Sequence, residues 1–271
     1  MLKYEVAGSG APLVLVHGIS HRRQAWYPVL DQLAEHRTVI LFDLPGHGQS
    51  HDLVTNGRPV TEVLHDELVG FFDQLGLDRP HIGGNSLGGR IALEAAADDL
   101  VASATALSPA GFWKGPVDFA YTRALFGTVI TVARAAQPLA PTLAHNKYGR
   151  TAMLGWLHAH PTRVDPELMI GDARAMVRAR PALRTMIRQA TVFDRPIPSH
   201  VPVTIAWAEH DRVLPPYQAK RAEAAYPELE HLMMKDVGHV PMPEDPAMVV
   251  DVLLEGSGGI HAVADGQAGV A

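Results

Sequence analysis

The strongest constraint on the fold is an alternation, along most of the chain, of short apolar runs with helix-like segments. The apolar runs occupy residues 12–16, 37–42, 101–107, 203–207 and 231–234. Such runs are typical of strands that are buried on both faces of a sheet. Segments with helical periodicity lie between several of them, as at residues 26–33 and 61–75. The alternation predicts an α/β fold with a mostly parallel central sheet that is flanked by helices.

The alternation stops near residue 111 and resumes near residue 198. Helical stretches, and no buried strand, are predicted in between, at residues 118–137, 147–160, 166–180 and 181–193. Residues 112–197 carry 12 Lys/Arg and 5 Asp/Glu, a net charge of +7, whereas the remainder carries 11 and 24, a net charge of −13. We therefore predict two structural units and a tail: an α/β core at 1–111 and 198–255, a helical unit at 112–197, and a flexible C-terminal tail at 256–271.

The composition limits the chemistry that is available. The chain has 271 residues and no cysteine, which excludes disulfides, thiolate metal sites and a cysteine nucleophile. A net charge of −6 argues against nucleic acid as a partner, and no apolar run is long enough to span a bilayer. Since the N-terminus has no signal-peptide pattern, we expect a cytoplasmic protein. It should act on a small-molecule substrate without a metal or a cofactor, and its oligomeric state is left open.

One serine is surrounded by glycines at a predicted junction between a strand and a helix. Residues 83–97 read GGNSLGGRIALEAAA, with a short strand expected before them and strong helix formers at their end. The stretch from Gly84 to Gly88 matches the pattern G-x-S-x-G, in which the serine occupies a strained turn with its hydroxyl exposed. The pattern also fits an ordinary glycine-rich turn. The interpretation of Ser86 as a nucleophile therefore depends on partners elsewhere in the chain.

Two further residues, Asp211 and His239, have the placement that partners of Ser86 require. A serine hydroxyl needs a base to take its proton, and that base must be oriented by a third group. Asp211 follows the strand predicted at 203–207, and His239 follows the one at 231–234. Taken singly, each fits an ordinary loop residue. All three nevertheless follow strands, at the sheet edge where open α/β proteins place their sites, and in an order known from one scaffold. We interpret them as a catalytic triad.

Backbone N–H groups near Ser86 are predicted to form an oxyanion hole. Acyl transfer passes through a tetrahedral oxyanion that such donors stabilise. One donor is expected at Leu87, directly after the nucleophile, and the other at Ile19, in the loop that follows the first buried strand. The ring of His17 is interpreted as a brace for that loop. Residues 43–50 are interpreted as a structural turn.

The motifs LVHG, DLPGHGQS, GNSLGG, WAEHD and GHVPMPEDP together resemble those of the α/β-hydrolase superfamily, in its capped serine hydrolase subgroup. The resemblance covers nearly all of residues 2–255 outside the helical unit. It implies Ser86 as nucleophile, His239 as base and then acid, and Asp211 as the residue that orients it, with Ile19 and Leu87 at the oxyanion hole. It also implies that 112–197 is a helical cap, or lid, inserted after the family's sixth strand. Because the family's usual first strand has no counterpart here, about seven strands are expected.

The resemblance leaves several activities open. Serine at position 86 excludes the branches that use an aspartate nucleophile, the haloalkane dehalogenases and epoxide hydrolases. We favour a carboxylesterase-like enzyme that forms an acyl-enzyme on Ser86. Asn85 resembles the carbon–carbon bond hydrolases of ring-fission products, although Val240 stands where those enzymes tend to carry tryptophan. Lactone cleavage is also compatible with the resemblance, and so is a ligand receptor of the same fold with slow turnover.

The predicted cap is expected to line an apolar substrate pocket. Aromatic, β-branched and methionine side chains suit this role, and they equally suit plain packing of the cap on the core. The basic excess of the cap either docks it on the acidic core or attracts an acidic substrate. The apolar residues concerned are Phe119, Tyr121, Phe126, Val129, Ile130, Val132, Met153, Met169, Met176 and Met186.

Overall fold

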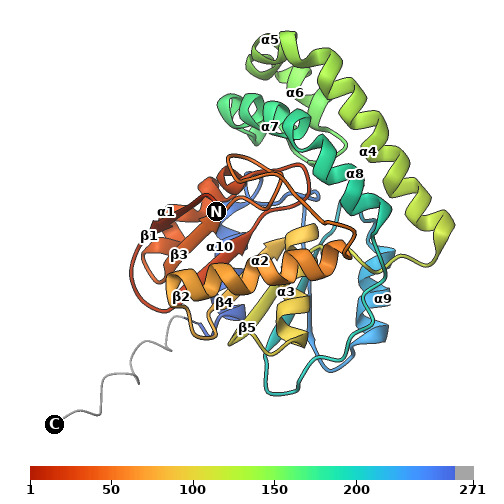
Figure 1. The fold of residues 1–271 in the computed structure, drawn as a ribbon. Coiled ribbons are helices and arrows are strands. Elements are labelled where there is room, and N and C mark those ends of the chain that lie inside the picture. Colours follow the sequence, from red (N-terminus) through yellow and green to blue (C-terminus); the bar gives the residue numbers. More distant parts are fainter. Residues whose placement is uncertain (260–271) are drawn as a thin grey trace.

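The computed structural model describes residues 1–259, and its centre is a seven-stranded sheet (Figure 1). The strands lie in the order β1-β3-β2-β4-β5-β6-β7. β1 runs antiparallel to β3, and the other pairs of this described sheet are parallel. The predicted α/β fold with a mostly parallel sheet of seven strands is confirmed. The strands are β1 Tyr4–Ala7, β2 Pro12–Val16, β3 Thr38–Phe42, β4 His81–Asn85, β5 Ser103–Leu107, β6 Val203–Ala208 and β7 Glu230–Met234.

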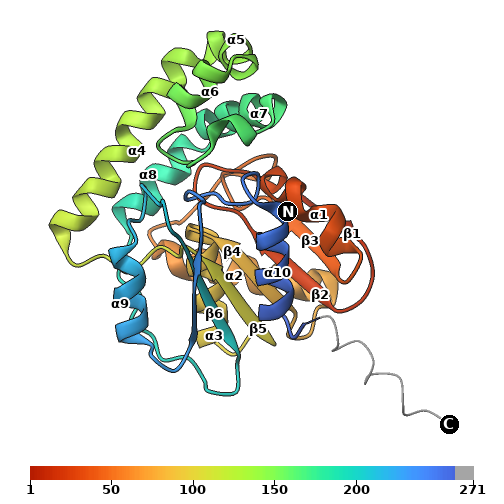
Figure 2. The same cartoon turned by 180° about the vertical axis from the view of Figure 1, so that it is seen from behind.

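Helices cover both faces of the sheet, which explains why its inner strands are apolar. α2 Val60–Leu75 and α3 Leu87–Ala97 lie in front of the sheet in Figure 1. α10 Pro246–Gly256 lies on the opposite face, in front in Figure 2, and packs against α1 Tyr27–Ala34. α9 Tyr217–Ala225 connects β6 to β7. The predicted apolar stripe of α2 is buried, at Val63, Leu64, Leu68, Phe71 and Phe72.

The segment between β5 and β6 forms a group of helices at one end of the sheet (Figures 1 and 2). They are α4 Pro116–Ala136, α5 Ala140–His145, α6 Lys147–Leu154, α7 Pro166–Arg178 and α8 Arg180–Arg188. The sequence predicted a single helix over 147–160, but α6 ends at Leu154. There the N–H groups of Leu157 and His158 both donate to the carbonyl oxygen of Leu154, which turns the chain back toward the core.

The C-terminal helix α10 leads into residues that bind the core. Arg37 donates hydrogen bonds to the carbonyl oxygens of Ser257 at 3.0 Å and of Gly259 at 2.9 Å. These two residues belong to the tail predicted at 256–271, of which residues 260–271 lie outside the described part of the chain. Across residues 1–259, no helix combines the length and apolar character that crossing a bilayer requires.

Candidate active site

Ser86 occupies the sharp turn between β4 and α3 that the sequence predicted. Its backbone has φ 59° and ψ −112°, a strained conformation for a residue other than glycine. Its N–H donates to the carbonyl oxygen of Leu107 on β5 at 2.9 Å. The neighbouring glycines make the turn possible, because a Cβ on Gly84 would overlap the backbone of Gly88, and one on Gly88 would overlap the carbonyl of Val16. The turn thus holds Ser86 at the carboxyl end of β4.

Asp211 and His239 meet in the structure, although they are 28 positions apart. His239 Nδ1 lies 2.6 Å from Asp211 Oδ2, and the two side chains are 3% and 0% exposed. The other carboxylate oxygen of Asp211 accepts the backbone N–H groups of Val213 at 2.8 Å and Leu214 at 2.7 Å. The carboxylate is therefore held at both oxygens, and the imidazole turns its Nε2 away from Asp211.

Asn85 joins the Ser86 turn to the loop that carries His239. Its Nδ2 donates to the carbonyl oxygen of His239 at 2.9 Å and to that of Leu107 at 3.2 Å. The residue before the serine and the backbone of the histidine are thus in direct contact. Asn85 therefore has a structural role, since its amide nitrogen serves two backbone carbonyls.

Glu244, a residue that was not predicted from the sequence, fastens the His239 loop to the insertion. Its carboxylate accepts the N–H groups of Gly238 at 2.5 Å and His160 at 2.9 Å, and lies 3.4 Å from His158 Nδ1. Burial would raise the pKa of Glu244, but these contacts with His158, Gly238 and His160 outweigh burial and lower it. The available signal was an acid five positions after His239, within the motif GHVPMPEDP.

Two buried histidines brace the loop after β2. His17 Nε2 accepts the N–H of Leu44 at 3.0 Å, and its Nδ1 donates to the carbonyl oxygen of Gly18 at 2.8 Å. His47 Nε2 accepts the N–H of Ser20 at 3.2 Å, and its Nδ1 donates to the carbonyl oxygen two residues earlier at 3.0 Å. Burial lowers the pKa of His17 well below its usual value and that of His47 to about 4. Both rings are therefore neutral braces, as the sequence suggested for His17.

This braced loop lies directly against Ser86. A Cβ on Gly18 would stand only 3.3 Å from the Cβ of Ser86. Ile19, Leu87 and Ser86 line one small cavity of about 60 Å³, which we call the nucleophile cavity. The two residues predicted to supply oxyanion donors are thus brought to the same cavity as Ser86. The rest of its wall is mostly apolar and includes Trp113, Phe119, Phe126, Met186, Ile187 and Leu214.

A second cavity, of about 300 Å³, lies between the inserted helices and the loop after β2. We call it the cap-side chamber; Ser20 and His21 line it from the core, and residues between 125 and 176 line it from the insertion. Tyr121 and Ile130 are absent from the described walls of both cavities, and the Tyr121 hydroxyl instead donates to the carbonyl oxygen of Arg212 at 2.6 Å. The other apolar residues expected to line a pocket divide between the chamber (Val129, Val132, Met153, Met169, Met176) and the nucleophile cavity (Phe119, Phe126, Met186).

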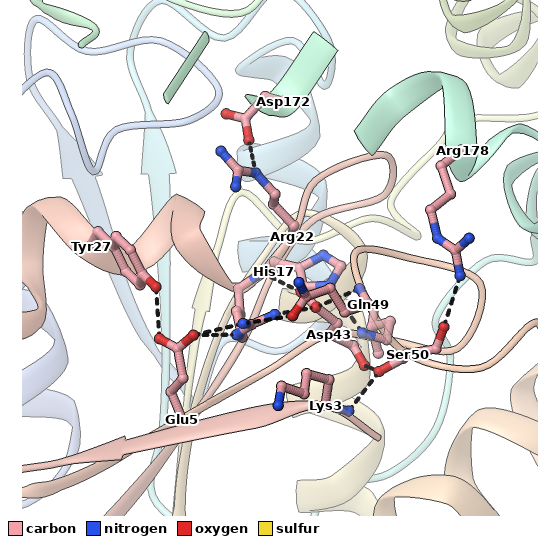
Figure 3. A network of polar contacts seen from close by, with 12 residues as sticks. Lys3, Glu5, His17, Arg22, Tyr27, Asp43, Gln49, Ser50, Asp172 and Arg178 are labelled. Carbon is pink, nitrogen blue, oxygen red and sulfur yellow. Dashed lines mark hydrogen bonds and ion pairs between the residues drawn. The ribbon is translucent and has the colours of Figure 1, made fainter. Parts of the chain in front are cut away.

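Polar contacts tie α7 to the loops of the core (Figure 3). Arg22 Nε donates to Asp172 Oδ1 at 2.9 Å, and Arg178 donates to the carbonyl oxygen of Ser50 at 3.1 Å. Ser50 in turn donates from its hydroxyl to the carbonyl oxygen of Asp43 at 2.6 Å. The turn interpreted as structural therefore also supports the inserted helices.

Known proteins share this architecture. The alpha/beta hydrolase family matches residues 13–252. An uncharacterized protein of Mycobacterium tuberculosis is 28% identical over 268 residues, covering 92% of this chain and 76% of that protein. Lipase 3 of a Moraxella species is 26% identical over 87% of this chain and 74% of the lipase. The structure of a thermophilic esterase from Thermogutta terrifontis has a TM-score of 0.67 at 24% identity, covering 94% of this chain and 92% of the esterase.

A mostly parallel sheet with a serine on the strained turn after β4 is typical of the α/β-hydrolase class of proteins. The chain belongs to the alpha/beta hydrolase family, which it matches over nearly its whole described length. Membership of this family, together with relatives such as the lipase, supports hydrolase activity.

Proposed function

We propose that the protein is a carboxylesterase-like serine hydrolase that cleaves an ester or related acyl bond of a small, largely apolar molecule. The observation that carries the proposal is the buried pair of His239 and Asp211, 2.6 Å apart, which Asn85 fastens to the Ser86 turn. A serine on a strained turn, an imidazole and a buried carboxylate are the three groups that this chemistry needs.

In the first step of the proposed mechanism, Ser86 Oγ attacks the acyl carbon and its proton passes to His239 Nε2. Asp211 accepts the hydrogen bond from Nδ1 and stabilises the imidazolium that forms. The backbone N–H groups of Ile19 and Leu87 donate to the oxyanion. When the tetrahedral intermediate collapses, the bond between the acyl carbon and the alcohol oxygen breaks. His239 then gives its proton to that oxygen, and the alcohol leaves.

In the second step, water replaces the alcohol. His239 removes a proton from the water as its oxygen attacks the acyl carbon on Ser86. Collapse of the second intermediate releases the acid and returns the proton to Ser86 Oγ. Residues 112–197 act as the cap in this proposal, because their apolar side chains wall both cavities and limit the access of water to the acyl-enzyme.

A screen of p-nitrophenyl esters of increasing acyl length tests the proposal. The expected result is a burst of p-nitrophenol followed by steady turnover, because an acyl-enzyme forms and is then hydrolysed. Ser86→Ala should lower turnover on the order of a million-fold while the circular dichroism spectrum stays unchanged. Ser199→Ala, at an exposed serine, is the matched control. Ester turnover by Ser86→Ala within tenfold of the wild-type rate would overturn the proposal.

The same screen distinguishes the competing activities when a lactone and a vinylogous diketone are added. Turnover of the diketone in preference to the esters would indicate carbon–carbon bond cleavage. A ligand-dependent rise in melting temperature with negligible turnover of every compound would indicate a receptor. The esterase is favoured because the amide of Asn85, which suggested carbon–carbon chemistry, has a structural role that requires no such substrate.

A further inference from the structure

The small volume of the nucleophile cavity restricts the group that can be bonded to Ser86. The cavity measures about 60 Å³. A water-sized group needs about 10 to 15 Å³ of such space, so the cavity holds about four to six atoms. Ser86, Ile19 and Leu87 all line it, so an acyl chain attached to Ser86 begins inside this space. That chain has room for only a few carbons before it meets a wall.

The cap-side chamber adjoins the nucleophile cavity along helix α4. The residues of α4 that line the nucleophile cavity are Phe119, Thr122 and Phe126. Those that line the chamber are Leu125, Thr128, Val129, Val132 and Ala133. Because a helix rises about 1.5 Å per residue, residues 119–126 and 125–133 are consecutive stretches of about 10 Å and about 12 Å. On the core side the order is the same, since Ile19 lines the cavity and the next residue, Ser20, lines the chamber. The two cavities therefore lie end to end.

A pair of packed rings stands between the two cavities. Phe126 belongs to the wall of the nucleophile cavity, and Trp156 belongs to the wall of the chamber. Their ring centroids lie 6.0 Å apart at an interplanar angle of 81°, which is edge-to-face packing. Phe126 is buried, and the Trp156 indole is fixed by donating from Nε1 to the carbonyl oxygen of Met153 at 3.0 Å. We call the two rings the aromatic partition.

The surroundings of the aromatic partition suit a straight alkyl chain. No charged side chain belongs to the described lining of the nucleophile cavity. The hydroxyl of Thr122 already accepts a hydrogen bond from Trp113 Nε1 at 3.4 Å. The end of the cavity at Phe119 is occupied by the packing of that ring on Trp113, with centroids 4.8 Å apart. A chain that lengthens along α4 therefore extends toward Phe126, and the chamber of about 300 Å³ lies beyond that ring.

We propose that the aromatic partition limits the length of the acyl group, and that Phe126 and Trp156 are specificity-determining residues. The enzyme prefers straight acyl chains of about six carbons or fewer, and longer chains enter the chamber only when one of the two rings is removed. This inference rests on the ester hydrolysis proposed above.

The test measures kcat/KM for p-nitrophenyl esters from acetate to decanoate. Each methylene that is buried should raise kcat/KM by up to about fourfold. In the wild-type protein the maximum should lie at hexanoate or a shorter ester, with decanoate at least about tenfold below it. Phe126→Ala should move the maximum to octanoate or longer and raise the decanoate-to-butanoate ratio at least about tenfold. Because the readout is a ratio within one variant, a general loss of activity does not affect it.

Two further variants locate the limit in the aromatic partition. Trp156→Ala should raise the same ratio, and since Trp156 is only half-buried, this variant remains informative if Phe126→Ala fails to fold. Phe119→Ala makes the same change as Phe126→Ala two turns earlier on α4, at the end away from the chamber. As the matched control it should change the ratio by less than about threefold. A change from Phe119→Ala as large as that from Phe126→Ala would overturn the inference.

A binding measurement separates this inference from the proposed function. Calorimetry follows straight-chain 2-alkanones, which are neutral and cannot be hydrolysed, in Ser86→Ala with and without Phe126→Ala. The added substitution should tighten binding of 2-decanone about tenfold and leave that of 2-pentanone within about threefold. If no ester is hydrolysed but this length-dependent gain appears, the limit at the aromatic partition stands and the ester reaction fails. If esters are hydrolysed but neither Phe126→Ala nor Trp156→Ala changes the decanoate-to-butanoate ratio, the limit is overturned and the ester reaction stands.

Discussion

Both carboxylate oxygens of Asp211 are engaged in hydrogen bonds. One accepts from His239 Nδ1, and the other accepts the N–H groups of Val213 and Leu214. An asparagine there must turn its NH₂ toward one of these donors, so the imidazole loses its orientation or its preferred tautomer. We expect Asp211→Asn to lower turnover of a p-nitrophenyl ester by about four orders of magnitude, less than Ser86→Ala. Steady-state rates of both variants measure this.

Two nearby acids provide controls for the role of Asp211. Glu209 pairs with Lys235 at 3.0 Å, and Asp236 lies 3.0 Å from His160 Nε2. Since these carboxylates are engaged elsewhere, Glu209→Gln and Asp236→Asn should keep turnover within about threefold of the wild-type rate. A loss from either variant as large as that from Asp211→Asn would mean that another acid orients the histidine.

The buried ring of His47 predicts how stability depends on pH. Its pKa is about 4 in the folded protein and 6.5 in an unfolded chain. Below about pH 6.5 the unfolded state therefore binds more protons, and the free energy of unfolding falls as the pH drops toward 4; above pH 6.5 this contribution is constant. In His47→Gln, we expect the free energy of unfolding to decrease by about 3 kcal/mol less than in the wild-type protein over this pH range. Urea unfolding between about pH 7.5 and about pH 4 measures it.

A matched control for His47 is His145→Gln, because the side chain of His145 is 63% exposed. Its replacement tests whether the loss of any histidine changes the pH dependence. If His47→Gln and the wild-type protein lost the same free energy of unfolding between neutral and acidic pH, the neutral, buried state of His47 would be refuted.

The contact between Asp211 and His239 could be predicted from the sequence, because each follows one of two apolar runs that are consecutive along the chain and that a parallel sheet ends at the same edge. The residues that hold Asp211, His239 and the neighbouring loops in place could not be predicted in this way. Glu244 accepts the backbone N–H of His160, in the insertion, and His47 accepts the backbone N–H of Ser20, in another loop. Such partners become neighbours only after the sheet has formed, so local propensity does not indicate them. The one sequence signal, the acid of the motif GHVPMPEDP, does not identify the partners of Glu244.

At the scale of elements, the start of α3 depends on its contact with the end of β2. A Cβ on Gly88, in the first turn of α3, would overlap the carbonyl of Val16, and Val16 cannot move away because β2 is paired with β3 on one side and β4 on the other. We expect Gly88→Ala to lower the free energy of unfolding by about 2 to 3 kcal/mol. Gly70→Ala in α2, where a Cβ meets open space, should raise it by roughly 0.5 to 1 kcal/mol. Parallel urea melts compare the two, and equal stabilities would contradict the close contact.

β4 shows where local propensity fails to predict an element. The sequence suggested a short strand at 80–82, directly before Gly83 and Gly84. Glycine is depleted in strands. The structure continues β4 through both glycines, which pair with Leu15 and Val16 of β2 on one side and with β5 on the other. A Cβ on Gly83 would crowd the side chain of Leu15. Pairing and space in the assembled sheet therefore override the intrinsic preference.

At the scale of the whole molecule, both ends of the helical insertion are joined to the core by aromatic packing. The ring of Phe112, at its start, lies 6.2 Å from that of Phe193, near its end. The same ring lies 6.1 Å from Trp207 of β6 and 6.2 Å from Tyr226 after α9. The insertion thus leaves and re-enters the core at one aromatic cluster, and the Arg90 guanidinium of the core lies 4.9 Å from the centre of the Phe193 ring.

The basic excess of the insertion contributes little to this contact. Among the described residues, its ion pairs with acids of the core involve Arg178, 3.9 Å from Asp52, and Arg195, 2.6 Å from Asp98. The described lining of the two cavities contains no lysine or arginine, whereas the cap-side chamber includes Asp172. Most of the positive charge therefore lies in solvent, away from the walls that would contact a substrate.

This distribution of charge predicts a weak response to salt. Attraction of an anion by exposed charges is screened beyond about 10 Å at an ionic strength of about 0.1 M, and no lysine or arginine of the described residues lines either cavity to bind it. We expect kcat/KM for the acetate and for the hemisuccinate of one alcohol to change by less than about twofold between low and high salt, with the neutral acetate preferred throughout. Arg195→Ala, which removes one of the two pairs with the core, should leave both responses small. A steep fall for the hemisuccinate alone would instead show that the basic helices guide acidic substrates to Ser86, and an equal steep fall for both esters would show that charge docks the insertion.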